Sequence, residues 1–357
     1  VSLQKRCDIC KGTNDKCDIC IILRHKPLRD KLEATGIRLK QFKDDTSEDD
    51  YGYRNSFLTG SYARKTGTRP PKDVDFFLIL DEERYGNGGK PNAATLLTML
   101  HSAISNIEGK EIFGYEVTAV DIQHRSVRVT FEDSFHVDII PAFETNQRLR
   151  DREVYEIPDK KLGRYILSNP KIHGDILRSA VSEADLPKLR DIIKLARRWK
   201  RDAFEDREEK PKSFHLEMIA IELLRGKTIG GYLDVLEQYF AELPNFFASP
   251  RMPDPACPDQ GTPEQWVDAY VGELTSEQRE IILGRIHQAH NVLKEARKLE
   301  SEGRIVPAIE TLRTLYPDLP EQQPETALKQ MKSSNPSPAY ATSGRTAPWN
   351  GSSASMV

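Results

Sequence analysis

The stretch GSYARKTGTRPPKDVDFFLIL, from Gly60 to Leu80, decides how the rest of this chain is interpreted. It begins with Gly-Ser, continues through a basic spacer with a proline pair, and ends with Asp73-Val74-Asp75 leading into an apolar run. Side chains alternate along a strand, so Asp73 and Asp75 are expected on the same face. The apolar run after them has no polar face, which is typical of a strand covered on both sides.

The two neighbouring acids indicate a cation site. Two carboxylates aimed at one point repel each other unless a cation lies between them, and a hard, oxygen-preferring ion such as Mg²⁺ suits the pair. Two solvated acids at the start of a strand are the simpler alternative. The upstream Gly-Ser favours the cation site, because Gly60 lets the backbone approach a ligand closely. Ser61 then offers a hydroxyl and an amide to phosphate oxygens.

A third acid follows in SVRVTFEDSFHVDIIPAF, from Ser126 to Phe143. This segment predicts two alternating strands joined by a turn at Glu132-Asp133-Ser134. Asp138 lies inside the second strand between apolar neighbours, where an ionised carboxylate is costly unless it is paired or bound to metal. Three acids from two strands, preceded by a phosphate-binding Gly-Ser, fit the two-metal arrangement of in-line phosphoryl transfer.

These motifs resemble those of the polymerase-β-type nucleotidyltransferases. The match consists of Gly60-Ser61, the Asp73-Val74-Asp75 pair, and Asp138 in the phrase HVDIIP. The phrase SFHLE, from Ser213 to Glu217, resembles the S-Y-x-L-E helix start of one branch, which contains oligoadenylate synthetase, cyclic GMP-AMP synthase and the bacterial CD-NTases. The resemblance implies an α+β, bilobal nucleotidyltransferase fold, with a small mixed-sheet lobe and a helical C-terminal lobe.

The resemblance also implies roles for individual residues. Asp73, Asp75 and Asp138 would be catalytic and would hold two Mg²⁺ ions, for which Mn²⁺ could substitute. The nucleotide would be bound by residues of both lobes: Gly60, Ser61, Lys194, Arg197, Ser213 and Phe214. Phe214 replaces the usual Tyr, which keeps stacking on the base and loses a hydroxyl.

The phosphate-binding cations are expected on the helix from Leu186 to Phe204, which carries an apolar stripe that includes Trp199. Family members have a Lys two residues before the aromatic residue of this helix. Arg197 stands at that position, which departs from the pattern, and Lys194 one turn earlier is the alternative. A plain solvated face for these cations, and a plain N-cap for Ser213, are the structural alternatives.

Composition and length predict the organisation of the chain. Its 357 residues are enough for two domains, and 38% hydrophobic content without a membrane-length apolar run or a signal peptide predicts a soluble, cytoplasmic protein. A net charge of −3 argues against strong nucleic-acid binding. Thr275 and Gln278 predict a capping box for a long helix. We expect a Cys-rich leader at 1–24, a catalytic core at 25–160, a helical lobe at 161–320 and a disordered tail at 321–357.

The leader contains a repeated CDIC motif with four of the five cysteines: Cys7, Cys10, Cys17 and Cys20. Two C-x2-C knuckles are the usual halves of a structural Zn²⁺ site. The gap between these two is shorter than in common zinc ribbons. Four free thiols in a reducing compartment are the alternative.

The predicted function is a template-independent, metal-dependent nucleotidyltransferase that makes a cyclic di- or trinucleotide from NTPs. Resemblance to CD-NTases implies bacterial anti-phage defence and a separate effector that reads the product. A linear oligonucleotide synthase, primed on tail hydroxyls such as that of Tyr340, is the second hypothesis. A non-catalytic nucleotide-sensing module is the third, which retention of all three acids and Ser61 disfavours.

Overall fold

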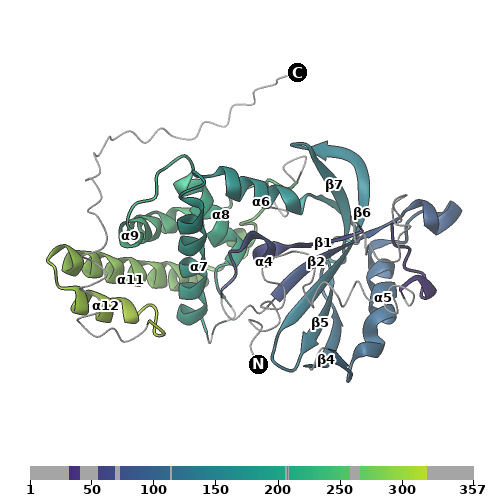
Figure 1. Ribbon diagram of the computed structural model, residues 1–357, viewed down its shortest axis with the longest axis horizontal. Helices are drawn as coiled ribbons and strands as arrows, with labels where there is room; N and C mark the ends of the chain where they lie inside the picture. The colour runs from purple at the N-terminus through teal and green to yellow at the C-terminus, as the bar shows by residue number, and fades with distance from the viewer. Residues whose placement is uncertain are drawn as a thin grey trace, which may run out of the picture.

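Two lobes lie side by side in the computed structural model, one built on a β-sheet and the other on helices (Figure 1). The structure describes residues 32–40, 55–68, 73–112, 115–205, 207, 209–257 and 266–319. The side chains of residues 87 and 112 are not described. The four leader cysteines and the predicted tail lie outside these residues, so the zinc site stays a prediction. No helix in the described ranges is long and apolar enough to cross a bilayer.

The sheet is mixed, as the sequence predicts. Its strands are β1 (Ser56–Thr59), β2 (Asp73–Leu80), β3 (Glu111–Ile112), β4 (Tyr115–Ile122), β5 (Val127–Phe131), β6 (His136–Leu149), β7 (Arg152–Asp159) and β8 (Arg164–Ser168). They run in the order β1-β2-β6-β5-β4-β3, with β7 paired to β6 and β8 paired to β7. β2 and β6 are parallel, and the other pairs are antiparallel.

Both faces of β2 are covered, which the unbroken apolar run predicted. Val74, Phe76 and Leu78 belong to the hydrophobic core that contains α5 (Ala93–Ile104). Phe77 and Ile79 point to the opposite face and join a smaller cluster there. Since side chains alternate along a strand, Asp73 and Asp75 share this second face. Figure 1 shows α5 on one side of the sheet and the helical lobe on the other, so the acids face the helical lobe.

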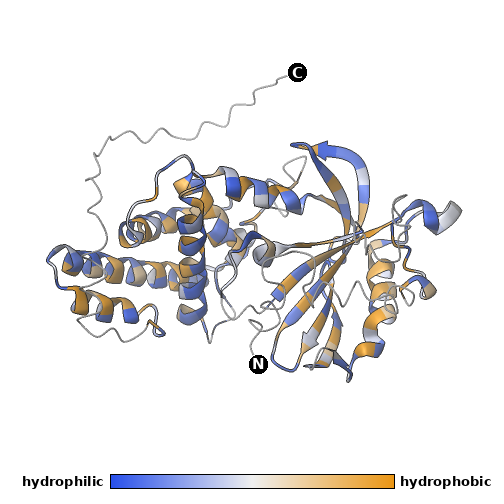
Figure 2. Ribbon diagram, viewed as in Figure 1, coloured by the Kyte–Doolittle hydropathy of each residue, from blue (hydrophilic) through white to orange (hydrophobic). Residues whose placement is uncertain are grey.

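The helical lobe contains α6 (Pro170–Ser179), α7 (Leu186–Ala203), α8 (Ser213–Leu224), α9 (Tyr232–Glu242), α10 (Tyr270–Glu273), α11 (Ser276–Ser301) and α12 (Ile305–Arg313). Short 3-10 segments are η1 (Glu83–Gly88), η2 (Ser105–Ile107) and η3 (Leu243–Phe247). The apolar stripe of α7 is buried, with Trp199 at 1% exposure, and Figure 2 shows apolar positions gathered between these helices. The predicted capping box is present, since the Thr275 side chain accepts from Gln278 N and the Gln278 side chain from Thr275 N.

The lobes meet beyond residue 160. β8 continues the sheet to Ser168, and α6 begins at Pro170. The predicted boundary between the catalytic core and the helical lobe, at residue 160, stays a prediction. The end of a sheet does not by itself define units that fold independently. The short helix α4 (Gly60–Arg64) follows β1 directly and carries the Gly-Ser dipeptide toward the helical lobe.

Candidate active site

The three predicted acids meet at one cavity of about 420 Å³. β2 and β6 run parallel, and their register places Asp75 beside Asp138 and Asp73 beside His136. All three aspartates line the cavity, together with Gly60 and Ser61 from α4. Residues far apart in sequence therefore come to one point because the two strands are neighbours in the sheet.

Gly60 allows this close approach. Its φ is +67°, a left-handed conformation that side-chain-bearing residues seldom adopt. A Cβ at this position would overlap the Asp75 Oδ2 atom and lie 2.7 Å from its Cγ atom. The glycine thus lets the α4 backbone lie against the carboxylate, and places the neighbouring Ser61 at the same cavity.

The carboxyl group of Asp75 has a raised pKa. Its pKa is raised from 3.8 to about 6, mainly by burial and also by the nearby carboxylates of Asp73 and Asp138, while Arg64 and Arg128 act in the opposite direction. A carboxylate that is buried beside two others is poorly compensated. Its charged form would gain from a cation placed between the acids.

Asp138 is held by a residue that the sequence reasoning missed. Arg128 of β5 lies directly across from it in the sheet register. The guanidinium donates to both carboxylate oxygens, Nε to Oδ1 at 3.0 Å and Nη2 to Oδ2 at 2.7 Å. Ser126 Oγ adds a 3.2 Å bond to Oδ1. These donors fix the orientation of the buried carboxylate.

The opposite wall of the cavity comes from the helical lobe. Ser213 and Phe214 begin α8 and line the cavity, as does Arg197 of α7. Lys200 Nζ donates to Ser213 Oγ at 2.7 Å. The pKa of Lys200 is lowered to about 8, mainly by burial and also by the charges of Arg197 and Lys210, while Asp73 acts in the opposite direction. In the sequence, Lys200 could have been found from its position directly after Trp199, the aromatic residue of the α7 stripe.

The two cations predicted on α7 have different positions. Arg197 reaches the cavity, where Nη1 donates to the Thr66 carbonyl at 3.1 Å and lies 3.7 Å from Glu217 Oε2. Lys194 does not line it and instead pairs with Asp191 at 3.0 Å. Positions three apart on a helix differ by about 60° around its axis, so Lys194 and Lys200 lie on opposite sides of Arg197. The structure therefore brings Lys200, rather than Lys194, to Ser213.

His173 of α6 is a further cavity residue without a sequence prediction. Its Nε2 lies 2.7 Å from Asp254 Oδ1, and its ring meets that of Phe214 at a centroid distance of 4.6 Å. Asp254 also accepts from Ala256 N at 2.9 Å. Phe214 is thus held from one side by a fixed imidazole, within a wall that also contains Pro170.

The donor chemistry fits a divalent cation. Asp73, Asp75 and Asp138 supply hard carboxylate oxygens, which Mg²⁺ prefers as ligands. Burial, together with the charges of Asp73 and Asp138, raises the pKa of Asp75, so its charged form would gain from a cation. Within the described ranges, no three His, Cys, Asp or Glu side chains lie close enough to hold an ion as they stand. The three aspartates could bind metal after side-chain adjustment, with Asp138 also bonded to Arg128.

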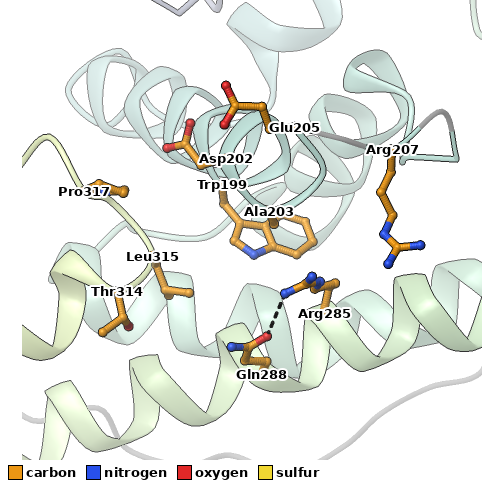
Figure 3. Close-up of a pocket in the computed structure, with 10 residues that line it drawn as sticks. All are labelled: Trp199, Asp202, Ala203, Glu205, Arg207, Arg285, Gln288, Thr314, Leu315 and Pro317. Atoms are coloured by element: carbon orange, nitrogen blue, oxygen red, sulfur yellow. Dashed lines mark hydrogen bonds between the residues drawn. The ribbon is translucent and has the colours of Figure 1, made fainter.

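A second cavity, of about 400 Å³, lies on another side of α7 (Figure 3). Trp199, Arg207, Arg285 and Gln288 are among its lining residues, and Arg285 Nη1 lies 3.4 Å from Gln288 Oε1. None of the predicted site residues that the structure describes lines it. It has neither the three acids nor the two serines, so it is a poorer candidate for phosphoryl transfer.

Comparison with known proteins identifies the sheet lobe. Residues 29–180 match the family model of the Second Messenger Oligonucleotide or Dinucleotide Synthetase (SMODS) domain. This segment of the chain is similar to the SMODS domain family. This match confirms the resemblance to the CD-NTase branch of the polymerase-β-type nucleotidyltransferases that the motifs indicated. No match was found among curated proteins.

Solved structures share the fold of this chain. The CD-NTase CdnG of Bradyrhizobium diazoefficiens, in complex with GTP, has a TM-score of 0.55 at 16% identity, over 84% of this chain and 93% of that one. CdnC of E. coli MS115-1, with ATP, has a TM-score of 0.52 at 19% identity, over 82% and 91%. Vibrio cholerae DncV cyclic AMP-GMP synthase, with a nonhydrolysable GTP, has a TM-score of 0.54 at 13% identity, over 74% and 68%. The bilobal α+β fold is thereby confirmed.

Proposed function

We propose that this chain is a metal-dependent, template-independent nucleotidyltransferase that joins NTPs into a cyclic di- or trinucleotide. The observation that carries the proposal is the pairing of Asp75 with Asp138 in one cavity whose other wall contains Ser213, to which Lys200 donates a hydrogen bond. Acids and phosphate-binding groups on facing walls are what transfer of a nucleotidyl group requires. The SMODS domain gives this chemistry its family context.

In this reaction a ribose hydroxyl of one nucleotide attacks the α-phosphorus of another. The new bond joins the hydroxyl oxygen to phosphorus, the bond from phosphorus to the bridging oxygen breaks, and pyrophosphate leaves with the electron pair. The hydroxyl proton passes to solvent. A second transfer between the joined nucleotides closes the ring of a cyclic dinucleotide, and a cyclic trinucleotide needs a third.

In this proposal, the residues of the two walls have different roles in binding the substrate and the metal ions. Ser61 and Ser213 offer hydroxyls to phosphate oxygens, and Lys200 places a positive charge beside Ser213. Phe214 provides a ring on which a base can stack. Asp73, Asp75 and Asp138 would hold two divalent ions, Mg²⁺ or Mn²⁺, which offset the charge that develops on the α-phosphate and the departing pyrophosphate.

The experiment is incubation of the protein with each labelled NTP and pairs of NTPs in the presence of Mg²⁺ or Mn²⁺. Products are then digested with phosphatase and nuclease. A phosphatase-resistant product that nuclease cleaves supports a ring, whereas a phosphatase-sensitive oligonucleotide supports a linear synthase. Asp75→Asn should lower the rate on the order of a thousandfold, because it removes a ligand charge from the reacting centre.

Failure to consume any NTP under all these conditions would overturn the proposal, as would near-normal turnover by Asp75→Asn. A cyclic product would also fit a place in bacterial anti-phage defence with a separate effector as its reader. That part of the proposal is tested by infecting bacteria that carry the wild-type or the Asp75→Asn protein. Equal phage yields from the two strains would contradict it.

A further inference from the structure

Glu217 is a buried carboxylate at the junction of the two lobes, with a side-chain exposure of 1%. Arg64 of α4 binds it through both ends of its guanidinium, Nε to Oε1 at 2.6 Å and Nη2 to Oε2 at 3.2 Å. Thr66 Oγ1 donates to Oε2 at 3.0 Å, and Arg197 Nη1 lies 3.7 Å from the same oxygen. One acid of the helical lobe therefore binds two residues of the sheet lobe.

The segment that Glu217 holds is the turn that follows the Gly-Ser dipeptide. Lys65 ends α4 in a left-handed conformation with φ of 61°, which is strained for a residue with a side chain. Thr66 N then donates back to the Ser61 carbonyl at 2.9 Å. From α7, Arg190 Nε donates to the Arg64 carbonyl and Arg197 Nη1 to the Thr66 carbonyl. The position of Ser61 is thus tied to this turn.

The ion pair also has a regular place on the two helices. Arg64 comes three residues after Ser61 on α4, and Glu217 comes four residues after Ser213 on α8. Positions three or four apart on a helix lie on the same side, one turn along. The Arg64–Glu217 bond therefore joins the two helices one turn beyond the two serine hydroxyls that line the cavity.

We propose that Glu217 is a positioning residue that sets the gap between Ser61 and Ser213, and with it the fit of a triphosphate between the lobes. The proposal rests on the proposed function, since it names the part of the substrate that the gap measures. Arg64 adds to the coupling, because its guanidinium also lies over the Phe214 ring at 5.3 Å from the centroid. One residue thereby links the serine turn, the ion pair and the stacking ring.

A purely structural clamp would have a different signature. If Glu217 only held the lobes together, its loss would weaken the binding of every nucleotide by a similar factor. If it sets the gap between the serines, its loss would weaken ligands that span the gap and spare those that do not. The comparison of an NTP with the corresponding NMP separates the two roles.

The test is Glu217→Gln, with dissociation constants measured for ATP, GTP, AMP and GMP in the presence of Mg²⁺. We expect NTP binding to weaken by about tenfold or more and NMP binding to change by less than about twofold. Thr66→Val, which removes one donor and keeps the ion pair, should produce a smaller loss in the same direction. Equal loss for NTP and NMP, or unchanged or tighter NTP binding, would overturn the proposal.

Two further variants keep the test interpretable. Glu33→Gln is the matched control, because Glu33 also accepts two bonds from one guanidinium, that of Arg84 at 2.7 and 2.9 Å, away from the cavity. It should leave both affinities unchanged. Arg64→Gln combined with Glu217→Gln removes both charges of the bidentate pair, so Arg64 is not left as an unpaired buried ion, and Arg197 keeps its bond to the Thr66 carbonyl. This double variant should fold and still lose NTP affinity selectively.

The outcome for the wild-type protein distinguishes this inference from the proposed function. Wild-type protein that binds no NTP would remove the proposed function and leave the gap without a ligand. Wild-type protein that binds and joins NTPs, with a Glu217→Gln variant that binds them equally well, would remove the inference alone.

Discussion

The two walls of the cavity come from different lobes and hold different charged groups. The sheet side has three aspartates with Arg64 and Arg125, and the helical side has Arg197 and Glu217, with Lys200 bonded to Ser213 behind it. On the sheet side, burial beside two other acids raises the pKa of Asp75 to about 6. On the helical side, burial beside Arg197 and Lys210 lowers the pKa of Lys200 to about 8. Burial is the main cause that pushes each group toward its neutral form, and like charges nearby add to the effect.

The contrast between the walls explains what ligand the cavity suits. A nucleoside triphosphate with divalent cations carries both signs of charge. Its phosphates would offset the cationic wall, and its metal ions would offset the acidic wall. If this account is correct, each wall can be disabled separately, and the two failures will differ in kind.

The largest effect is expected from Gly60→Ala on the acidic wall. The new Cβ would overlap Asp75 Oδ2, so the carboxylate or the α4 backbone must move. We expect a loss in kcat on the order of a thousandfold, because catalysis depends on the placement of that charge. Single-turnover measurements at saturating NTP would show it.

Gly109→Ala is the control for backbone strain alone. Gly109 also has a positive φ, of 72°, but among the described residues no atom beyond its chain neighbours lies within 4 Å of the place that a Cβ would take there. This substitution should lower stability slightly and leave kcat within a few-fold of wild type. Equal losses from the two glycine substitutions would show that conformational strain, and not contact with Asp75, is responsible.

A smaller effect is expected from Lys200→Met on the cationic wall. Removing the charge beside Ser213 should raise the KM for NTP about a hundredfold and change kcat less, because the lost contact binds substrate in the ground state as well. Lys194→Met is the matched control on the same helix, since Lys194 pairs with Asp191 outside the cavity. A larger effect from Lys194 than from Lys200 would reverse the assignment.

The plot of kcat/KM against pH should fall on both sides of a maximum, by about tenfold per pH unit. The acidic wall should account for the fall at low pH and the cationic wall for the fall at high pH. Below about pH 6 Asp75 is protonated, so kcat/KM should fall as the pH is lowered. Above about pH 8 Lys200 loses its proton, so kcat/KM should fall again. Lys200→Arg should remove the alkaline limb and keep the acidic one, because arginine stays protonated.

The acidic limb has a counterpart in stability without metal. The pKa of Asp75 is about 6 in the folded protein, against an ordinary value of 3.8 for an aspartate in the unfolded chain. This group therefore favours the folded state at low pH, and that contribution is lost as the pH rises from about 4 to about 6. Asp75→Asn should flatten the slope of the melting temperature against pH, measured by thermal unfolding of the metal-free protein. An unchanged slope would mean that Asp75 does not titrate in this range.

Much of the fold and of the acidic wall could be predicted from sequence. The Asp-Val-Asp pair followed by an unbroken apolar run indicated a strand covered on both faces, and β2 is one. The stripe through Trp199 and the Thr275–Gln278 capping box likewise identified α7 and the start of α11. These features are local, because each is written in residues within a few positions of one another.

The cationic wall was harder to predict because it depends on rotation about a helix and on partners from elsewhere. Lys194, Arg197 and Lys200 have similar local sequence, and only the direction in which α7 faces the cavity separates them. Arg128 and Glu217 have the same difficulty. Each acts through a partner distant in sequence, Asp138 for one and Arg64 for the other.

The sequence by itself determined the chemistry of this protein: three acids, a Gly-Ser dipeptide and a serine at a helix start, each fixed by residue type and short spacing. The tertiary structure alone decided how these groups meet. Parallel pairing of β2 with β6 brought Asp75 to Asp138, and docking of α8 against α4 joined Glu217 to Arg64. The reason is physical, since strand pairing and lobe docking depend on contacts between distant segments, which local spacing does not specify.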